Sequence, residues 1–172
     1  ICMCSMPAAH ALAAGRRMAD LLVRLLDLPA RPALDAGIII RRPLSAESGL
    51  IADWVTTNFH RGWADEIAPA FARQPISLFT AQRENTLLGF AAYNVTAPGF
   101  FGPTGVATTA RRQGIGAALV WAAMDALRHL GHVYAFIGDS ADDAFYARTC
   151  GATPLPGTGT SLYAHMLQAK ND

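Results

Sequence analysis

The sequence predicts an α/β domain with a mixed β-sheet and helices on its faces. Short segments rich in β-branched and aromatic residues alternate with longer segments that carry apolar residues at helical spacing. Two of the short segments, 76–82 and 87–95, flank Glu84-Asn85, which indicates a β-hairpin. An apolar stripe over 114–130 predicts a long helix that packs on the sheet. This order of elements is typical of a sheet covered by helices.

The first predicted element is a short helix over 18–28 that ends before Pro29. Its apolar stripe consists of Leu21, Leu22, Leu25 and Leu28. We expect residues 1–36 to form a flexible leader plus this helix, with Met18 as a plausible start of the native chain, and residues 37–172 to form the folded domain. The stripe fits packing on its own domain or on a second copy, so a homodimer stays open.

The folded domain then continues in a regular order. Ser45 is a good N-cap for a helix that runs to about Phe59, with Leu50 among the residues expected to face inward. Gly131 and Gly151 are expected to end helices. The other predicted elements are strand 38–42, helix 63–73, the hairpin strands, strand 100–107, helix 114–130, strand 132–137, helix 142–150 and a last strand near 161–166.

The composition excludes several classes of protein. The chain has 14 basic and 13 acidic residues and a net charge of +1, so no overall field attracts nucleic acid. No apolar run reaches the roughly 18 residues of a membrane-spanning helix. Three cysteines cannot form a disulfide framework, and their sparse spacing does not indicate a metal site. This cysteine usage fits a reducing compartment, and we expect a cytoplasmic location.

The strongest local feature is the segment Arg111–Gly116 at the start of the long helix. Gly114 and Gly116 have no Cβ and let a ligand approach the backbone closely. The first N–H groups of a helix have no internal acceptors, so they favour an anion, and the two arginines add positive charge. A P-loop would need a Lys-Ser/Thr pair, and the dinucleotide fingerprint would need a small residue where Leu119 stands. A diphosphate is the ligand expected here; a tight turn that only packs helix on strand is the structural alternative.

Two segments resemble motifs of the GNAT superfamily of acyl-CoA N-acyltransferases. Val106–Gly116 is similar to the superfamily's strand-ending valine followed by Arg/Gln-x-x-Gly-x-Gly/Ala at a helix start. Phe145–Ala152 resembles its aromatic-Tyr-x-Lys/Arg-x-x-Gly segment. The order of predicted elements from Ile38 onward agrees with that family. The resemblance implies a mixed, mostly antiparallel sheet of six to seven strands, with helices on both faces and splayed strands four and five.

The resemblance also implies how acetyl-CoA would be held as a co-substrate. Strand four would be 100–107 and strand five 132–137, with the pantetheine arm in the gap between them. The Val106 N–H would polarise the thioester carbonyl, and the N–H groups of Gln113–Ala117 would hold the pyrophosphate. The residues expected to bind the donor are Val106, Ala107, Arg111, Arg112, Gln113, Gly114, Ile115, Gly116 and Ala117.

Two residues are candidates for catalysis. Tyr146, in the second motif, would protonate the departing thiolate, because the pKa of a phenol lies above that of a thiol. A packed core tyrosine is the structural alternative. The acidic residue that the family often carries on strand four is absent here. Asp139, after strand five, is the best candidate for the base, and Glu66 or a water path are alternatives.

Aromatic residues are concentrated in the segments that would flank the acceptor: Trp54, Phe59, Trp63, Tyr93, Phe100 and Phe101. Trp63, Tyr93 and Phe101 are the candidate substrate residues, and ordinary core packing is the alternative for each. The predicted function is transfer of an acetyl group from acetyl-CoA to a primary amine of a small molecule or peptide, by direct attack on the thioester. The alternative is a module of the same fold that binds acyl-CoA without turnover.

Overall fold

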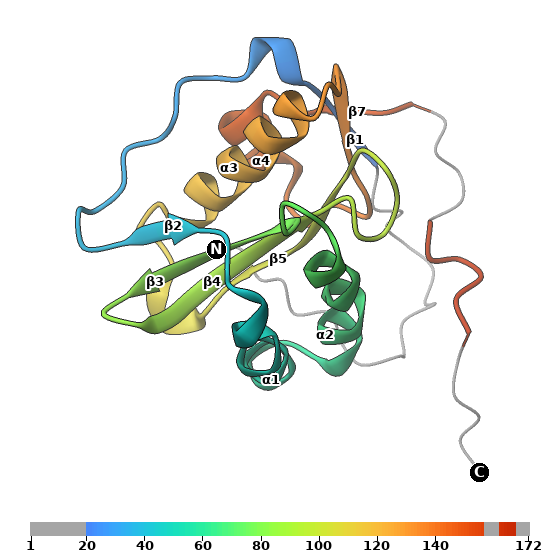
Figure 1. Cartoon of the computed structure of the whole chain (residues 1–172). Coiled ribbons are helices and arrows are strands. Elements are labelled where there is room, and N and C mark those ends of the chain that lie inside the picture. The colour runs from blue at the N-terminus through green and yellow to red at the C-terminus, as the bar shows by residue number, and fades with distance from the viewer. Residues whose placement is uncertain (1–19, 157–161, 168–172) are drawn as a thin grey trace.

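A seven-stranded sheet forms the centre of the computed structural model, which describes residues 20–156 and 162–167. The strands lie in the order β2-β3-β4-β5-β6-β1-β7 (Figure 1). They are β1 (Leu21–Arg24), β2 (Ile39–Arg41), β3 (Leu78–Arg83), β4 (Thr86–Tyr93), β5 (Phe100–Val106), β6 (Tyr134–Ile137) and β7 (Thr153–Pro154). All neighbouring pairs are antiparallel except β5 and β6, which are parallel. The predicted mixed, mostly antiparallel sheet is therefore confirmed.

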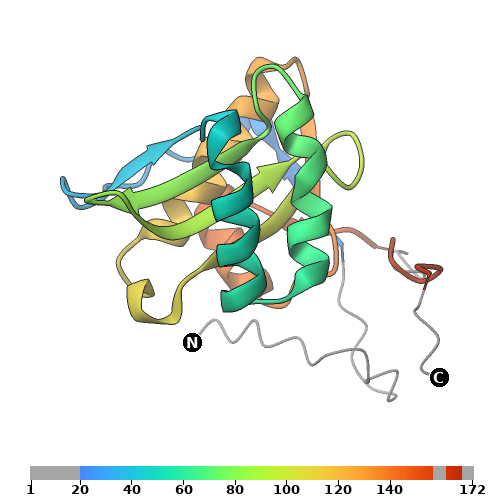
Figure 2. The ribbon, with the colours of Figure 1, turned by 60° about the horizontal axis from the view of Figure 1, so that its bottom comes forward.

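Helices cover both faces of this sheet. One face carries α1 (Ser48–Asn58) and α2 (Arg61–Ile67), and the other carries α3 (Ile115–His129) and α4 (Asp143–Cys150) (Figures 1 and 2). Short 3₁₀ turns complete the description: η1 (Leu25–Asp27), η2 (Ser45–Glu47), η3 (Ala68–Ala72) and η4 (Thr108–Ala110). In the part of the chain that the structure describes, no helix is long and apolar enough to cross a membrane.

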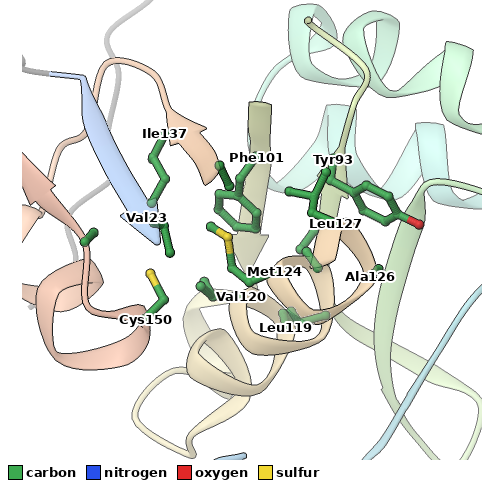
Figure 3. Packing of buried hydrophobic residues seen from close by; sticks show 14 of the residues in the cluster. Val23, Tyr93, Phe101, Leu119, Val120, Met124, Ala126, Leu127, Ile137 and Cys150 are labelled. Atoms are coloured by element: carbon green, nitrogen blue, oxygen red, sulfur yellow. The ribbon is translucent and has the colours of Figure 1, made fainter. Parts of the chain in front are cut away.

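Side chains from alternate positions of the strands form two cores. Ala91 and Tyr93 of β4 pack in the core under α3, whereas Phe90 and Ala92 pack under α1 and α2. This alternation follows from the two-residue period of a strand. Figure 3 shows the first core, where Met124 of α3 lies near Phe101 of β5. The two cores fix α1 and α3 on opposite faces of β4 and β5.

Strands β5 and β6 separate after a short contact. Their register contains only the pairs Phe100 with Phe136 and Phe101 with Ile137. Beyond this point β5 continues to Val106 while β6 ends. The C-terminal half of β5 therefore has no strand partner on that side within the described residues, at the place where the splay of the two strands is predicted.

The prediction of a helix over 18–28 is wrong for the described residues. Leu21–Arg24 forms β1, which pairs antiparallel with β6 and β7, and Leu25–Asp27 forms a 3₁₀ turn. Leu21 and Val23 are buried and Arg24 is exposed, which is the period of a strand. The three apolar residues Leu21–Val23 fit either period, and pairing with β6 decides between them. Residues 21–27 thus belong to the sheet and the turn after it, and do not form the helix on which a possible homodimer contact depended.

Most other predicted elements are confirmed, with three corrections. Leu44, not Ser45, precedes the first turn, and its N–H donates to Glu47 Oε2 at 2.6 Å. Leu50 is 65% exposed rather than inward. The predicted strand near 161–166 is not formed by the described residues: 162–165 make a turn, 166 and 167 have no regular structure, and residue 161 lies outside the described part. The hairpin is confirmed, and both turn residues have positive φ, 46° and 64°.

Candidate functional site

The loop between β5 and α3 leaves a row of backbone N–H groups at a helix start. Gly114 is the N-cap of α3 with φ of +78°, a left-handed conformation that favours glycine. The first helical hydrogen bond joins the Ala118 N–H to the Gly114 carbonyl at 3.0 Å. The N–H groups of Ile115, Gly116 and Ala117 therefore precede the helical ladder and can bind an anion.

The arginines of this loop lie beside those N–H groups. Arg111 Nε donates to the Val106 carbonyl at 3.3 Å, which ties the loop back to the end of β5. Arg112 has φ of +67° and is exposed. Gln113 is exposed too, and its Oε1 accepts a hydrogen bond from Arg83 at 3.2 Å. The loop is thus positively charged and has a defined conformation.

A pocket of about 610 Å³ joins this loop to β5, α4 and the end of α1. Its size suits a small-molecule site. Its lining residues are Phe59, Thr104, Gly105, Val106, Ala110, Arg111, Arg112, Gly114, Ile115, Gly116, Ala117, Val120, Asp142, Phe145, Tyr146 and Arg148. Phe59 follows α1, whereas Val120 belongs to α3 on the opposite face. The pocket therefore reaches both faces of the sheet, beside the unpaired half of β5.

The Val106 N–H points into the open side of β5. Gly89 of β4 lies opposite Val106, and the next residue, Ala107, donates its N–H to the Leu88 carbonyl at 2.9 Å. Successive N–H groups of a strand point to opposite sides, so the Val106 N–H faces away from β4. On that side β6 has already ended, at Ile137. A thioester carbonyl in the pocket would find a backbone donor there.

Tyr146 lies on α4, and the local sequence fixes the position of that helix. Asp142 Oδ1 accepts the Phe145 N–H at 2.9 Å as an N-cap, and Gly151 ends the helix with φ of +69°. The Tyr146 ring is half-buried and meets the Phe101 ring edge-on, with 6.0 Å between centroids. Tyr146 and Val106 both line the pocket, so the structure brings a phenol and the backbone donor to one cavity.

Three other predicted site residues lie outside the pocket lining. Ala107 and Gln113 flank it but do not line it. Asp139, the candidate base, follows β6 with φ of +47°, and its backbone N–H donates to Asp20 Oδ1 at 3.2 Å. The structure therefore does not bring Asp139 to the pocket that holds Tyr146.

The candidate substrate residues fall mainly in the cores. Tyr93 is 1% exposed, and its hydroxyl oxygen accepts a hydrogen bond from Arg42 Nη1 at 2.5 Å. Phe101 is 4% exposed and packs under α3 (Figure 3). Trp63 is partly buried, 5.1 Å from the Phe59 ring between centroids. None of the three lines the pocket, although Phe101 supports Tyr146 and Trp63 supports Phe59.

Glu66, the alternative base, belongs to a separate hydrogen-bonded group. Its Oε1 accepts hydrogen bonds from Tyr163 Oη at 2.8 Å and from Thr96 Oγ1. Burial, followed by the bond to Glu66, raises the pKa of Tyr163 far above its usual value. The group ties residue 163 to α2 and lies outside the pocket lining.

Sequence reasoning missed several lining residues. They are Thr104, Gly105, Ala110, Val120, Asp142 and Arg148. Val120 lies four residues after Gly116 on α3, so helical spacing from the glycine loop is the signal that would have found it. The others depend on the divergence of β5 from β6 and on where α4 docks, which local patterns do not reveal.

The charges of the pocket come from the loop and from α4. Arg111, Arg112 and Arg148 line it together with one carboxylate, Asp142, which already caps α4. Cys150, at the end of α4, is buried outside the lining, and burial raises the pKa of its thiol to about 11. The thiol therefore stays protonated near neutral pH and is no nucleophile. The pocket is net positive at one end and suits a phosphorylated ligand.

Comparison with solved structures places this fold among known acetyltransferases. A GCN5-related glucosamine N-acetyltransferase region of a fungal multi-domain GH3 β-N-acetylglucosaminidase matches with a TM-score of 0.66 and 18% identity, over 80% of this chain and 19% of that chain. A GCN5-related N-acetyltransferase from Kribbella flavida matches with a TM-score of 0.61 and 24% identity, over 81% of this chain and 55% of that chain. A Mycobacterium tuberculosis protein in complex with CoA matches with a TM-score of 0.57 and 20% identity, over 72% of this chain and 76% of that chain.

These structural matches support a conclusion about the fold alone. The chain spans less than two thirds of the length of the first two structures, and at these identities the likeness shows the fold. No curated protein matches the chain. The model of the acetyltransferase (GNAT) family, however, matches residues 48–152, more than half of the chain and the whole span from α1 to α4. The chain therefore belongs to the GNAT acetyltransferase family.

Proposed function

We propose that the protein transfers an acetyl group from acetyl-CoA to a primary amine of a small molecule or peptide. Membership in the GNAT family supports acyl transfer in general. The observation that carries the proposal is the shared pocket. One cavity contains the start of α3, the end of β5 and Tyr146.

The pocket residues suggest a role for each part of the donor. The N–H groups of Ile115–Ala117 and the loop arginines would hold the pyrophosphate. The Val106 N–H would stabilise the negative charge that develops on the thioester oxygen when the amine attacks the carbonyl carbon. As the C–S bond breaks, Tyr146 would give its proton to the leaving sulfur.

Deprotonation of the amine is assigned to water rather than to Asp139. The lining contains one carboxylate, Asp142, and one of its oxygens already accepts the Phe145 N–H. An amine attacks only when it is neutral, so a reaction without a strong base should speed up as pH rises toward the pKa of the free amine. Acceptors of lower pKa should be the better substrates at neutral pH.

The test is release of free CoA from acetyl-CoA in the presence of a panel of amines. The panel should contain sugar amines, amino acids, arylalkylamines and peptides with free N-termini. We expect release that depends on one acceptor class, with the acetylated product seen by mass spectrometry. Saturable acetyl-CoA binding without turnover of any amine would contradict the proposed transfer.

That outcome would support a second candidate function. The protein would then be a module that binds acyl-CoA and serves as a sensor or interaction domain. The observation that favours it is the single, helix-capping carboxylate of the pocket lining. Failure of any CoA thioester to bind would exclude both functions.

A further inference from the structure

Among residues 20–156 and 162–167, Phe59 is the only lining residue of the pocket that comes from the α1–α2 side of the sheet. The others belong to β5, to the β5–α3 loop, to α3, or to the segment from Asp142 to Arg148. Phe59 follows directly after α1, where its N–H donates to the Val55 carbonyl at 2.9 Å. The ring thus closes the pocket on the face opposite to α3.

The tip of the Phe59 ring rests on Gly105 of β5. A Cβ at Gly105 would lie 2.2 Å from Phe59 Cζ, which no real side chain tolerates. Gly105 has no positive φ that would itself favour glycine. The close approach of the Phe59 ring is therefore the reason why this position carries no side chain. Gly105 precedes Val106, whose N–H faces the pocket. The ring therefore stands next to the position where the thioester carbonyl would bind.

Aromatic rings behind Phe59 hold it in place. Its centroid lies 5.9 Å from Trp54, 5.1 Å from Trp63 and 5.8 Å from Phe90. These rings belong to the core under α1 and α2. Loss of the Phe59 ring would join an apolar cavity in this core to the pocket, since the neighbouring rings are fixed by their own packing.

The lining of the pocket is charged near the loop and α4 and becomes apolar toward Phe59. Its charged lining residues come from the loop and α4, whereas the residues beside the ring are Thr104, Gly105 and Val106. Thr104 Oγ1 already donates to the Phe90 carbonyl at 2.9 Å. The far end is therefore apolar, suited to the hydrocarbon end of an acyl group rather than to a charged group.

We propose that Phe59 sets the length of the acyl group that the pocket accepts, by closing its apolar end against Gly105. The inference rests on the proposed function, because it assumes an acyl-CoA donor in this pocket. With the ring in place, an acetyl group fits and a longer chain meets the ring. Without the ring, each added methylene enters apolar space and gains about fourfold in affinity, from roughly 0.8 kcal/mol per buried methylene.

The test compares acyl chain lengths within each variant, so it needs no knowledge of the acceptor. Dissociation constants of acetyl-, butanoyl- and hexanoyl-CoA are measured by calorimetry for the wild type and for Phe59→Ala. Butanoyl-CoA has two more methylenes than acetyl-CoA, so Phe59→Ala should raise its affinity relative to acetyl-CoA by about fifteenfold. The wild type should prefer acetyl-CoA to both longer donors.

Phe71→Ala is the matched control. Phe71 packs against the same core but does not line the pocket. The same chemical change there should leave the preference for acetyl-CoA unchanged. If Phe59→Ala does not fold, Phe59→Leu, which removes less of the side chain, should shift the preference in the same direction by a smaller factor.

Three results would overturn the inference. One is equal binding of hexanoyl- and acetyl-CoA by the wild type. Another is an unchanged preference among the three acyl-CoAs in folded Phe59→Ala or Phe59→Leu. The third is a wild type that binds no CoA thioester, which would also remove the proposed function; the first two leave the proposed function intact.

Discussion

Tyr146 is the side chain on which the chemistry of the proposed transfer depends most. The second motif predicted its position in sequence, and the structure places it on α4 at the pocket wall. The edge-on contact with Phe101 fixes the direction of its ring. The sequence could not show this contact, because Phe101 and Tyr146 meet only after β5 and α4 have packed on α3.

Removing the Tyr146 hydroxyl should slow transfer without weakening donor binding. Tyr146→Phe keeps the ring and its packing but removes the proton for the leaving thiolate. We expect kcat to fall by roughly 100-fold, within the usual range for loss of a general acid, and the dissociation constant of acetyl-CoA to stay within about twofold. Steady-state kinetics and calorimetry measure the two quantities.

Tyr134→Phe is the control for this prediction. Tyr134 lies on β6, is exposed and does not line the pocket. Its variant should keep the wild-type rate. Equal rates for Tyr146→Phe and Tyr134→Phe would mean that Tyr146 only packs against its neighbours.

At the scale of elements, the start of α3 is the proposed site for the pyrophosphate of the donor. The sequence predicted this helix and its glycines well, because helical spacing and glycine conformation are local properties. Asp139 illustrates the opposite case. Its place in the sequence suggested a base near the thioester, but its direction depends on how the chain turns after β6, and the structure does not bring it to the pocket.

Gly114→Ala should weaken donor binding through the backbone. With φ of +78°, a side chain at this position costs about 1 kcal/mol and shifts the first N–H groups of α3. We expect the affinity for acetyl-CoA to fall by about tenfold, as for loss of roughly one hydrogen bond to a charged group. Calorimetric titration measures this change.

Gly131→Ala is the control that distinguishes a loss of acetyl-CoA binding from a loss of folding stability. Gly131 has φ of +92° at the other end of α3, and no atom lies within 4 Å of the point where a Cβ would stand. This variant should lose similar stability in thermal unfolding but keep its affinity for acetyl-CoA. If both variants lose affinity equally, the start of α3 is not the anion site.

The start of α1 is held to β2 by an ion pair. Arg41 makes two hydrogen bonds to Glu47, at 2.7 and 2.6 Å, and the Leu44 N–H makes a third. These contacts hold the pKa of Glu47 at about 2, below its usual 4.5. The pair therefore orients the helix that ends at Phe59.

Glu47→Gln should destabilise the protein in a pH-dependent way. A lowered folded-state pKa adds stability that is complete above pH 4.5 and is lost as pH falls toward 2. Because the pair is partly exposed, we expect a loss of up to about 1 kcal/mol, or about 2–4 °C in Tm, at pH 7. Thermal unfolding from pH 7 to 2 should show the difference from the wild type shrink below pH 4.5.

Asp65→Asn is the control for this prediction. The Arg61–Asp65 pair is exposed on α2, and its loss should not change Tm measurably. A difference between the wild type and Glu47→Gln that persists at pH 2 would show that the variant acts through packing rather than through the charge.

For the whole molecule, the sequence predicted the class of fold and the glycine-containing loop before α3, but not how the sheet is completed. The prediction failed at both ends, where β1 was taken for a helix and residues 162–166 for part of a strand. In both places a short apolar segment is compatible with more than one kind of secondary structure. Contacts with residues far away in the sequence determine which one forms. The pocket itself arises between elements far apart in sequence, because β6 ends beside Phe101 while β5 continues, and Phe59 joins the lining from the other face of the sheet.

The central claim is that this pocket binds acetyl-CoA with the pyrophosphate at the start of α3. A calorimetric titration of acetyl-CoA into the wild-type protein tests it most directly, repeated with Gly114→Ala and Gly131→Ala. We predict saturable one-to-one binding that free CoA competes with, weakened in Gly114→Ala and retained in Gly131→Ala. Absence of saturable binding to the folded wild type would contradict the account.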